Sequence, residues 1–409
     1  MSDPAIGKPP GKHYSPEVLS DVATRILMAA GTPGGIAEQV AALLVWSERI
    51  GHPSHGLLRI RPYLERIRAG RLAPAATPTV VRESDSGSIL SGNWGFGQVS
   101  AMTAADLAID KASKQGVSVV GAYHINHIGR LGDYTERCAG KGLVGILLVG
   151  GAPTGMLGNV APFGGRSPVW GTNPLAIAVP VEDEVFSLDF ATSLIAGGKA
   201  AAARARGEML DGEHLIDVDG KTTNDPWALE RGGAIRPFGD HKGYALAFAI
   251  ELLAGAMVGA MAPELARGDL HNGMLMIVID PSGLGDAEVF RASARSIIEK
   301  VRASPGAAGF PESGSGGCAP VALTGTAKPG VEIGESAACE RLLAVGALGA
   351  AFAGHGQRRE QAEIDVHRLE RLGLGAAGDV AEQRAKRRRR RWRGGRRARR
   401  LGRRETPGE

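Results

Sequence analysis

The chain alternates between stretches with the three-to-four-residue apolar period of amphipathic helices and short, apolar, β-branched runs. Ser15 stands before Pro16 and Glu17, as the N-cap and first turn of a helix do, so the first helix is predicted at residues 15–30. The stretch 241–260 is apolar nearly throughout and is expected to form a buried helix. Further helices are predicted at residues 35–50, 56–69, 98–115, 131–141 and 288–303.

Short apolar runs predict the strands. They lie at residues 116–125, 143–151, 174–181, 185–192 and 274–280. The first two of these runs flank the predicted helix at 131–141, and strand–helix–strand alternation is typical of an α/β layer. The predicted fold class is therefore α/β.

The character of the chain changes near Pro305, where regular apolar periodicity ends. We expect four segments: an N-terminal extension at 1–14, one large globular region at 15–305, a divergent Gly/Ala/Arg-rich segment at 306–383 and a basic, disordered tail at 384–409. The globular region is long enough to bury a sizeable core, because 43% of the 409 residues are hydrophobic.

Composition excludes several classes of protein. Cys138, Cys318 and Cys339 are far apart and odd in number, which indicates neither a disulfide framework nor a metal site. No run of about 18 apolar residues predicts a membrane span. The first residues lack the apolar core of a signal peptide, so the cytoplasm is the expected compartment.

The net charge of +5 is unevenly distributed. Residues 384–409 hold 14 Lys or Arg and 2 Asp or Glu, a net charge of +12, which leaves −7 for the rest of the chain. Nucleic-acid binding would therefore depend on this tail alone. The tail has a single aromatic residue, Trp392, and a solvated, disordered tail is the favoured interpretation.

Familiar cofactor motifs are not found. The glycine-rich stretch GNWGFG at 92–97 does not stand between a predicted strand and a phosphate-binding helix, so no dinucleotide fingerprint of the Rossmann type is predicted. Metal-ligand spacings are also missing, and no metal is expected.

One helix face is predicted to bring three polar side chains together. Ser54 and His55 are followed by Arg59 at four and Tyr63 at eight residues from the histidine. An imidazole can pass a proton to a carbonyl oxygen near neutral pH, and a guanidinium can hold a carboxylate. The alternative interpretation is an ordinary polar helix face in solvent.

Two more polar groups are associated with predicted strands. His127 lies just after one strand, where ligands bind in α/β folds. The same residues are also compatible with a helix start capped by Asn126. Asp189 interrupts an apolar strand, and a buried carboxylate requires a partner such as an imidazole.

Glycines and small polar residues are concentrated at residues 161–180. Gly171 allows close approach of a ligand to the backbone, and Thr172 and Asn173 supply hydrogen-bonding side chains. A long turn before a strand is the alternative. Lys242 lies in the first turn of the long apolar helix, where the helix dipole favours an anion.

In their order along the chain, these groups resemble the type-2 malate/L-lactate dehydrogenase family. The resemblance runs from about Ser15 to Pro305 and depends on SHGLLRIRPYLERI, HINHIGRLGDY, PFGGRSPVWGTNPLAIAVP, LDFATS, DGKTTNDPWAL and HKGYALAFAIELLAG. It implies a non-Rossmann NAD(P)-binding α/β fold, with a mixed sheet and flanking helices, and a homodimer. It also implies NAD or NADP as cofactor and a small carboxylate substrate, either a 2-hydroxy acid and its 2-oxo acid or a cyclic imino acid.

The resemblance also implies roles for individual residues. His55, paired with Ser54, would pass the proton, and Asp189 would orient His55 and stabilise its charged form. His127 matches a histidine that is the catalytic base in some members, so the choice between the two histidines stays open. Arg59 would clamp the substrate carboxylate. The remaining residues implied at the substrate and cofactor sites are Tyr63, Gly171, Thr172, Asn173, Lys242 and Gly243.

Three departures from the family pattern stand out. Gly150 and Gly151 replace a Thr-Asn or Thr-Ser pair, and Asp240 replaces a glycine. The family's Pro-Gly-Glu segment and following helix are not found in the expected pattern after residue 305. One hypothesis is a frameshifted C-terminus in a catalytically impaired member.

Overall fold

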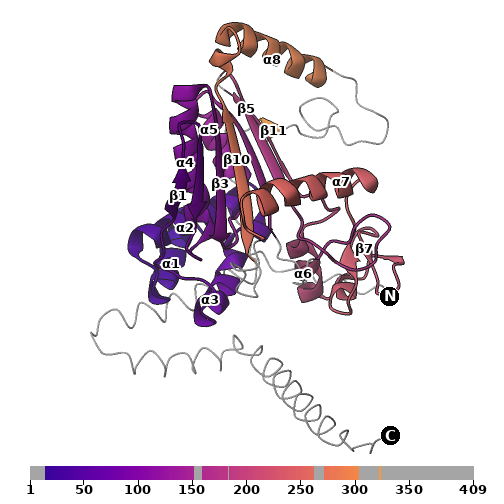
Figure 1. The fold of residues 1–409 in the computed structure, drawn as a ribbon. Coiled ribbons are helices and arrows are strands. Elements are labelled where there is room, and N and C mark those ends of the chain that lie inside the picture. The colour runs from indigo at the N-terminus through magenta and orange to yellow at the C-terminus, as the bar shows by residue number, and fades with distance from the viewer. Residues whose placement is uncertain (1–13, 152–158, 183, 262–270, 304–321, 324–409) are drawn as a thin grey trace, which may run out of the picture. The chain divides into compact units, whose positions relative to one another are not determined.

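A computed structural model of the chain describes residues 14–151, 159–182, 184–261, 271–303 and 322–323 (Figure 1). Its helices and helical turns are α1 (Pro16–Ala29), α2 (Gly34–Arg49), η1 (Pro53–His55), η2 (Leu57–Arg59), α3 (Ile60–Arg68), α4 (Gly97–Gln115), α5 (Gly132–Ala139), α6 (Gly197–Arg206), η3 (Pro226–Leu229), α7 (His241–Ile250), the π-helix η4 (Glu251–Met257), η6 (Pro281–Gly283) and α8 (Ala287–Arg302). Its strands are β1 (Thr79–Glu83), β2 (Gly87–Ser91), β3 (Val117–Ile125), β4 (Val144–Gly150), β5 (Leu175–Val181), β6 (Glu184–Phe190), β7 (Leu215–Ile216), β8 (Thr222–Thr223), β9 (Ala234–Ile235), β10 (Asn272–Ile279) and β11 (Ala322–Leu323).

An eight-stranded sheet has the order β1-β2-β3-β10-β4-β5-β6-β11. Only the β2–β3 pair is parallel among its described pairs, and the other six are antiparallel. The prediction of an α/β fold with a mixed sheet is confirmed, and this order is not that of a doubly wound parallel sheet. A second, small antiparallel sheet has the order β8-β7-β9.

Both faces of the large sheet are covered at its strand β10. Along β10, Met274 and Met276 belong to the core beneath α4 and α5, whereas Leu275 and Ile277 belong to a second cluster with the residues of η4. Successive side chains of a strand point to opposite faces, so helices lie on both sides of β10. Because both faces of β10 are buried, its sequence is one continuous apolar run without polar alternation.

The N-terminal helices have a core of their own. Ser15 caps α1 by accepting a hydrogen bond from the Val18 N–H, as the sequence predicted. Figure 1 shows α1, α2 and α3 gathered at one end of the sheet. The single helix predicted at 56–69 is wrong, because two 3₁₀ turns precede α3, which begins at Ile60.

The helix predicted at 241–260 differs from expectation in two ways. It changes at Glu251 from the α-helix α7 to the π-helix η4. It is also not buried on all sides, because Phe248, Leu252 and Met257 are 48%, 50% and 58% exposed. Within the described residues, none of the helices is long and apolar enough to cross a membrane.

The interpretation of the glycine-rich stretch at 92–97 is corrected. It does connect a strand, β2, to a helix, α4, in a β-α-β unit with parallel strands. The prediction missed this because the five residues of β2 were not recognised as a strand. Gly97 nonetheless serves close packing of two backbone segments, since a Cβ on it would lie 2.1 Å from the Asn126 carbonyl oxygen.

The predicted domain boundary lies outside the described residues, as do residues 306–383 except for β11 and the whole of 384–409. The frameshift hypothesis and the basic tail also concern those residues. The described residues include elements that the sequence analysis did not predict, namely β1, β2, α6 and the three strands of the small sheet.

We expect Gly97→Ala to lower the free energy of unfolding by about 1–3 kcal/mol, because the added methyl group overpacks a contact between two backbone segments. Chemical denaturation measures this directly. Gly35→Ala is the matched control: it lies in α2 with open space around it and should be neutral or slightly stabilising, by at most about 1 kcal/mol. An unchanged denaturation midpoint for the Gly97 variant would contradict the close packing.

Candidate active site

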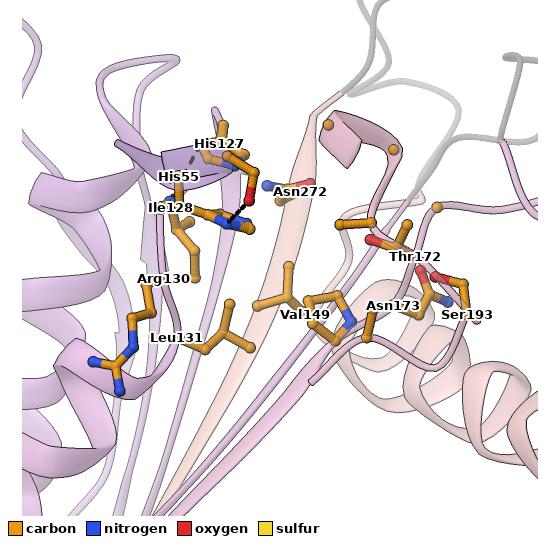
Figure 2. A pocket seen from close by; sticks show the side chains of 18 of the residues that line it. His55, His127, Ile128, Arg130, Leu131, Val149, Thr172, Asn173, Ser193 and Asn272 are labelled. Atoms are coloured by element: carbon orange, nitrogen blue, oxygen red, sulfur yellow. Dashed lines mark hydrogen bonds between the residues drawn. The ribbon is translucent and has the colours of Figure 1, made fainter. Parts of the chain in front are cut away.

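A cavity of about 780 Å³ opens where the ends of β3 and β6, the start of β10 and the start of α6 meet the turns η1 and η2. Figure 2 shows His55 and His127 on one side of this space, with Thr172, Asn173 and Ser193 across from them. The sequence-predicted residues that line the cavity are Ser54, His55, Arg59, Tyr63, His127, Gly171, Thr172, Asn173 and Asp189.

His55 is the last residue of η1. Its Nδ1 atom lies 3.1 Å from the Ser54 hydroxyl oxygen, and its ring stacks on that of His127 with 5.5 Å between centroids. Burial, followed by the nearby positive charge of Arg59, lowers the pKa of His55 to about 4. His55 is therefore neutral at pH 7 in the protein alone.

Arg59 is tied to the same turn. Its Nε atom donates a 2.7 Å hydrogen bond to the Ser54 carbonyl oxygen, which attaches the guanidinium to the turn that carries His55. The predicted single helix face is not what brings them together, because two 3₁₀ turns carry these residues. A guanidinium in this position can receive a carboxylate.

Glu48, which the sequence analysis missed, packs beneath the junction of the turns η1 and η2. Its carboxylate accepts a 2.8 Å hydrogen bond from the Leu57 N–H, and it occupies the space beside Gly56, where a Cβ would lie 2.3 Å from its Oε1 atom. Burial raises the pKa of Glu48, against the opposing effect of the Leu57 N–H. No motif identifies this residue, because its partner lies nine residues away across a break between helices.

His127 follows β3 and lies on the cavity wall. Its Nδ1 atom is 2.9 Å from the Tyr63 hydroxyl, and the Gly129 N–H donates to the same atom at 3.3 Å. Burial and then the positive charge of Arg59 lower the pKa of His127 well below its usual value. Tyr63 is almost fully buried in the cavity wall, where its hydroxyl is hydrogen-bonded to His127.

Asp189 makes different contacts from those predicted. Its Oδ2 atom accepts a 2.8 Å hydrogen bond from the Gly132 N–H and lies 3.9 Å from the Arg130 Nε atom. Among the described residues, Asp189 makes no hydrogen bond to His55. Burial raises the pKa of Asp189, whereas the Gly132 N–H and Arg130 act to lower it.

Arg130 is the centre of a buried ion-pair cluster that the sequence analysis missed. Its guanidinium contacts Asp133 at 2.7 Å and also pairs with Glu136, which accepts a hydrogen bond from Ser187. Figure 2 shows the Arg130 guanidinium directed away from His55. Burial raises the pKa of Asp133 to about 6, although Arg130 opposes the shift.

The segment before β5 contributes backbone more than side chains. Asn173 has a φ of 36°, and its amide donates to the Ala247 carbonyl at 3.0 Å and to Glu251 at 2.7 Å. The amide nitrogen therefore holds the junction of α7 and η4, and Asn173 also lines the cavity. Thr172 lines the cavity.

Lys242 and Gly243 do not line the cavity among the described residues. Lys242 is exposed in the first turn of α7. Gly243 has a packing role, since a Cβ there would lie 2.3 Å from the Phe238 carbonyl oxygen. Of the predicted cofactor residues, Gly171, Thr172 and Asn173 therefore line the cavity, whereas Lys242 and Gly243 lie outside it.

The start of α6 is a further part of the cavity that the sequence analysis missed. Gly197, Gly198 and Lys199 line the cavity, and no side chain caps this helix N-terminus. Asn159 lies beside it with a buried Oδ1 atom that has no hydrogen-bond partner among the described residues. The Gly-Gly-Lys sequence after a predicted strand was the available signal, because uncapped helix starts attract anions.

These features fit a nicotinamide dinucleotide together with a small acid. The cavity is larger than a three- or four-carbon acid fills, and Ile128, Leu131 and Val149 provide an apolar wall. The uncapped helix start and Lys199 suit a phosphate. The orphaned Asn159 oxygen suits a hydroxyl or amide donor.

The structure shows the surroundings of two of the departures. Gly151 has a φ of 90°, and a Cβ there would lie 2.5 Å from the Gly273 nitrogen, so this chain leaves no room for a larger residue. Asp240 has a φ of 54°, a conformation that favours glycine, and its carboxylate lies 3.4 Å from Arg236.

Comparisons with known proteins agree with this architecture. The family profile described as malate/L-lactate dehydrogenase matches residues 14–314. The L-sulfolactate dehydrogenase of Methanothermobacter thermautotrophicus is 38% identical over 296 residues, covering 71% of this chain and 85% of the relative. The Delta(1)-pyrroline-2-carboxylate reductase 1 of Burkholderia ambifaria is 36% identical over 274 residues, covering 65% and 79%. The structure of a putative malate/lactate dehydrogenase from E. coli has a TM-score of 0.72 at 29% identity, covering 88% of this chain and 99% of that one.

We expect Arg130→Met to lower the free energy of unfolding by about 3–5 kcal/mol at pH 8, because buried carboxylates lose their counter-charge. The loss should shrink toward pH 5. Burial raises the pKa values of Asp133 and Asp189, so the stability associated with their protonated forms is present at low pH and is lost as the pH rises through those values.

The matched control is Arg137→Met, which breaks the exposed pair with Asp106 and should cost less than about 1 kcal/mol at both pH values. Urea denaturation at pH 5 and pH 8 measures all three proteins. Equal losses for the two arginine variants would show that the Arg130 cluster contributes no more than a surface pair.

Proposed function

Because the chain belongs to the malate/L-lactate dehydrogenase family, we propose that it interconverts a small 2-hydroxy acid and its 2-oxo acid with a nicotinamide dinucleotide. The dehydrogenase class follows from family membership. The identity of the acid and the roles of individual residues are proposals that depend on the cavity.

A single observation supports this function most strongly: a neutral imidazole and a guanidinium are tied to one turn inside one cavity. The hydrogen bond of 2.7 Å from Arg59 to the Ser54 carbonyl keeps the carboxylate-binding group next to His55. A 2-oxo or 2-hydroxy acid has a carboxylate directly beside its reacting carbon. The arrangement therefore matches the one feature that all such acids share.

Proton movement is assigned to His55. In the oxidation direction, His55 is neutral and accepts the proton of the substrate hydroxyl. In the reduction direction, the carboxylate held by Arg59 partly cancels the positive charge that lowers the His55 pKa, which favours the protonated donor form. The Ser54 hydroxyl can donate to or accept from His55 Nδ1, so it can hydrogen-bond to both the neutral and the protonated form of His55.

Asp189 has a modified role in this proposal. It holds the Gly132 N–H and so positions the segment between His127 and α5, instead of orienting His55 directly. Its negative charge also acts on His52 at the cavity mouth, where it opposes the pKa-lowering effects of burial and Arg130.

The proposed cofactor is NAD or NADP, which supplies or accepts the hydride when bound. Gly171, Thr172 and the start of α6 are the proposed contacts, and Lys242 stays a candidate only for a part of the cofactor outside the cavity. The sparse, widely separated cysteines support the cytoplasm as the proposed compartment.

Reduction of a cyclic imino acid is the second candidate function. It is favoured by the 36% identity to the Delta(1)-pyrroline-2-carboxylate reductase. Such a substrate also presents a carboxylate next to the carbon that receives hydride, so Arg59 would serve both reactions. The two candidates differ in whether an oxygen or a nitrogen must receive the proton.

We also propose a homodimer formed through the outer side of α7 and η4. Phe248, Leu252, Leu253 and Met257 are exposed apolar residues on this continuous helical segment. A contiguous apolar surface of this kind is typical of an interface. The helix also provides Asn173 with its backbone partner, so a dimer would stabilise one wall of the cavity.

The catalytic proposal predicts turnover of NADH or NADPH by the purified chain with at least one 2-oxo acid or cyclic imino acid. His55→Ala should lower kcat by about 10²–10⁴-fold, because a positioned proton donor is lost. Arg59→Gln should mainly raise KM. Initial rates with oxaloacetate, pyruvate, 2-oxoglutarate and a cyclic imino acid test both candidates.

His214→Gln is the control for this experiment, since His214 lies outside the cavity and pairs with Asp211. It should leave all rates unchanged. Full activity of the His55 variant would remove His55 from the mechanism, and the absence of turnover from folded wild-type protein would refute the proposed enzyme activity of this chain.

The proposed interface predicts that Leu252→Glu and Met257→Glu convert a dimer to a monomer at micromolar concentration. Size-exclusion chromatography with light scattering reports the mass. Leu284→Glu is the control, because Leu284 is the most exposed large apolar residue described and lies away from α7 and η4. A wild-type monomer, or a dimer that survives both substitutions, would disprove the interface.

A further inference from the structure

A hydrogen-bonded chain runs from the core to the cavity through Tyr63. The Gln98 amide Nε2 atom donates to the Tyr63 hydroxyl at 2.6 Å, and that hydroxyl lies 2.9 Å from His127 Nδ1. Gln98 and Tyr63 are only 1% and 2% exposed, so water does not compete for these contacts. The donor and acceptor roles along the chain are therefore set by the protein.

A backbone contact indicates which nitrogen of His127 carries the proton. The Gly129 N–H donates to Nδ1 at 3.3 Å, and a backbone N–H can only donate. Nδ1 must therefore present its lone pair, and the neutral ring carries its proton on Nε2. The Tyr63 hydroxyl then donates to Nδ1 as well, which agrees with its accepting a bond from Gln98. At 2.9 Å this contact is shorter than that of Gly129, so Tyr63 supplies the stronger of the two hydrogen bonds that favour the Nε2–H form.

His55 is held differently. Its Nδ1 partner is the Ser54 hydroxyl, which can either donate or accept, so neither tautomer of His55 is excluded. The two rings nonetheless stack, with an interplanar angle of 19°. The two adjacent imidazoles therefore differ in the tautomers open to them. His55 can adopt either tautomer, whereas His127 is restricted to the one with its proton on Nε2.

We propose that Tyr63 is a positioning residue that keeps His127 in the Nε2–H form, so that His127 donates a hydrogen bond to the substrate oxygen and does not exchange a proton. This inference depends on the proposed function and assigns different tasks to the two histidines. The proton of the substrate hydroxyl moves to and from His55, whereas His127 polarises the C–O bond and stabilises negative charge on the oxygen.

The electrostatics around His127 favour this division. Burial, and after it the charges of Arg59 from η2, His55 from η1 and Arg66 from α3, lower the pKa of His127 well below its usual value. A protonated His127 is therefore disfavoured, and its only useful proton is the one on Nε2. A fixed donor in a water-poor site is worth about 10²–10³ in kcat.

The tautomer can be measured without any substrate. In full-length protein with ¹⁵N in the histidine rings, the wild-type spectrum at pH 7 should show a bare Nδ1 and a protonated Nε2 for His127, assigned by the signals lost in His127→Gln. Tyr63→Phe should shift His127 toward a mixture of tautomers. A proton on Nδ1 in the wild type, or identical His127 signals in wild type and Tyr63→Phe, would overturn the proposal.

Kinetics separate the two histidines. A glutamine amide can donate from a position near Nε2 but cannot exchange a proton, so His127→Gln should keep the wild-type pH dependence of kcat while lowering its value. His55→Gln should lose that pH dependence. The reverse pattern, with the pH dependence lost in His127→Gln and kept in His55→Gln, would refute the division of tasks.

Tyr63→Phe should lower kcat by about two- to tenfold with little change in KM, as expected for the loss of one hydrogen bond that contributes roughly 1 kcal/mol. Tyr14→Phe, at the N-terminal edge of the helical cluster, is the matched control and should be kinetically silent. A KM effect alone would instead make Tyr63 a substrate-binding residue. The spectra keep the test independent of the proposed activity.

Discussion

The cavity depends on one buried amide, that of Asn126 at the end of β3. Its Nδ2 atom donates to the carbonyls of Trp94 and Gly95 at 2.8 and 3.0 Å, and its Oδ1 atom accepts from Arg66 at 2.8 Å. Its own carbonyl receives a long contact of 3.4 Å from Asn272. The Asn126 side chain thus links the β2–α4 loop to α3. It does so directly before His127 in the chain. Because Asn126 is only 2% exposed, removal of its side chain would take these hydrogen bonds away at a position that is closed to solvent.

The charges near the cavity are arranged by the same segment. Arg130 pairs with acidic residues of α5 instead of facing the two histidines, whereas Arg59 stays in the cavity wall. Burial together with Arg59 keeps both His55 and His127 neutral at pH 7, so neither repels an approaching cationic group and neither attracts a carboxylate away from Arg59. In the proposed function, substrate binding and proton transfer therefore belong to separate residues that line the same cavity.

Close approach of backbone segments explains features that the sequence presents as anomalies. Gly97, Gly151 and Gly273 each lie where a Cβ would be 2.0–2.5 Å from a backbone atom of another segment. The glycine-rich stretch at 92–97 therefore serves packing against the end of β3, although its spacing resembles a phosphate-binding loop. The glycine that replaces a larger family residue at position 151 allows β4, β10 and η4 to meet. The π-helix η4 begins at Glu251 in the same region, and the Asn173 amide donates a hydrogen bond to the Glu251 carboxylate.

The sequence by itself determined the α/β class, the approximate position of most long elements and the family, because apolar periodicity and ordered motifs are local signals. It also identified His55, Arg59 and His127, whose chemistry is evident from residue type. Only the tertiary structure decided which partners the site residues have: Asp189 contacts Gly132 and Arg130 instead of His55, and the Tyr63 hydroxyl contacts His127 within the cavity wall. Glu48, Gln98 and Arg130 could not be found from local patterns, because their roles come from contacts and burial created when distant segments pack. A hydrogen bond or a pKa shift depends on distance and solvent exclusion in three dimensions, and neither quantity is encoded by spacing along the chain.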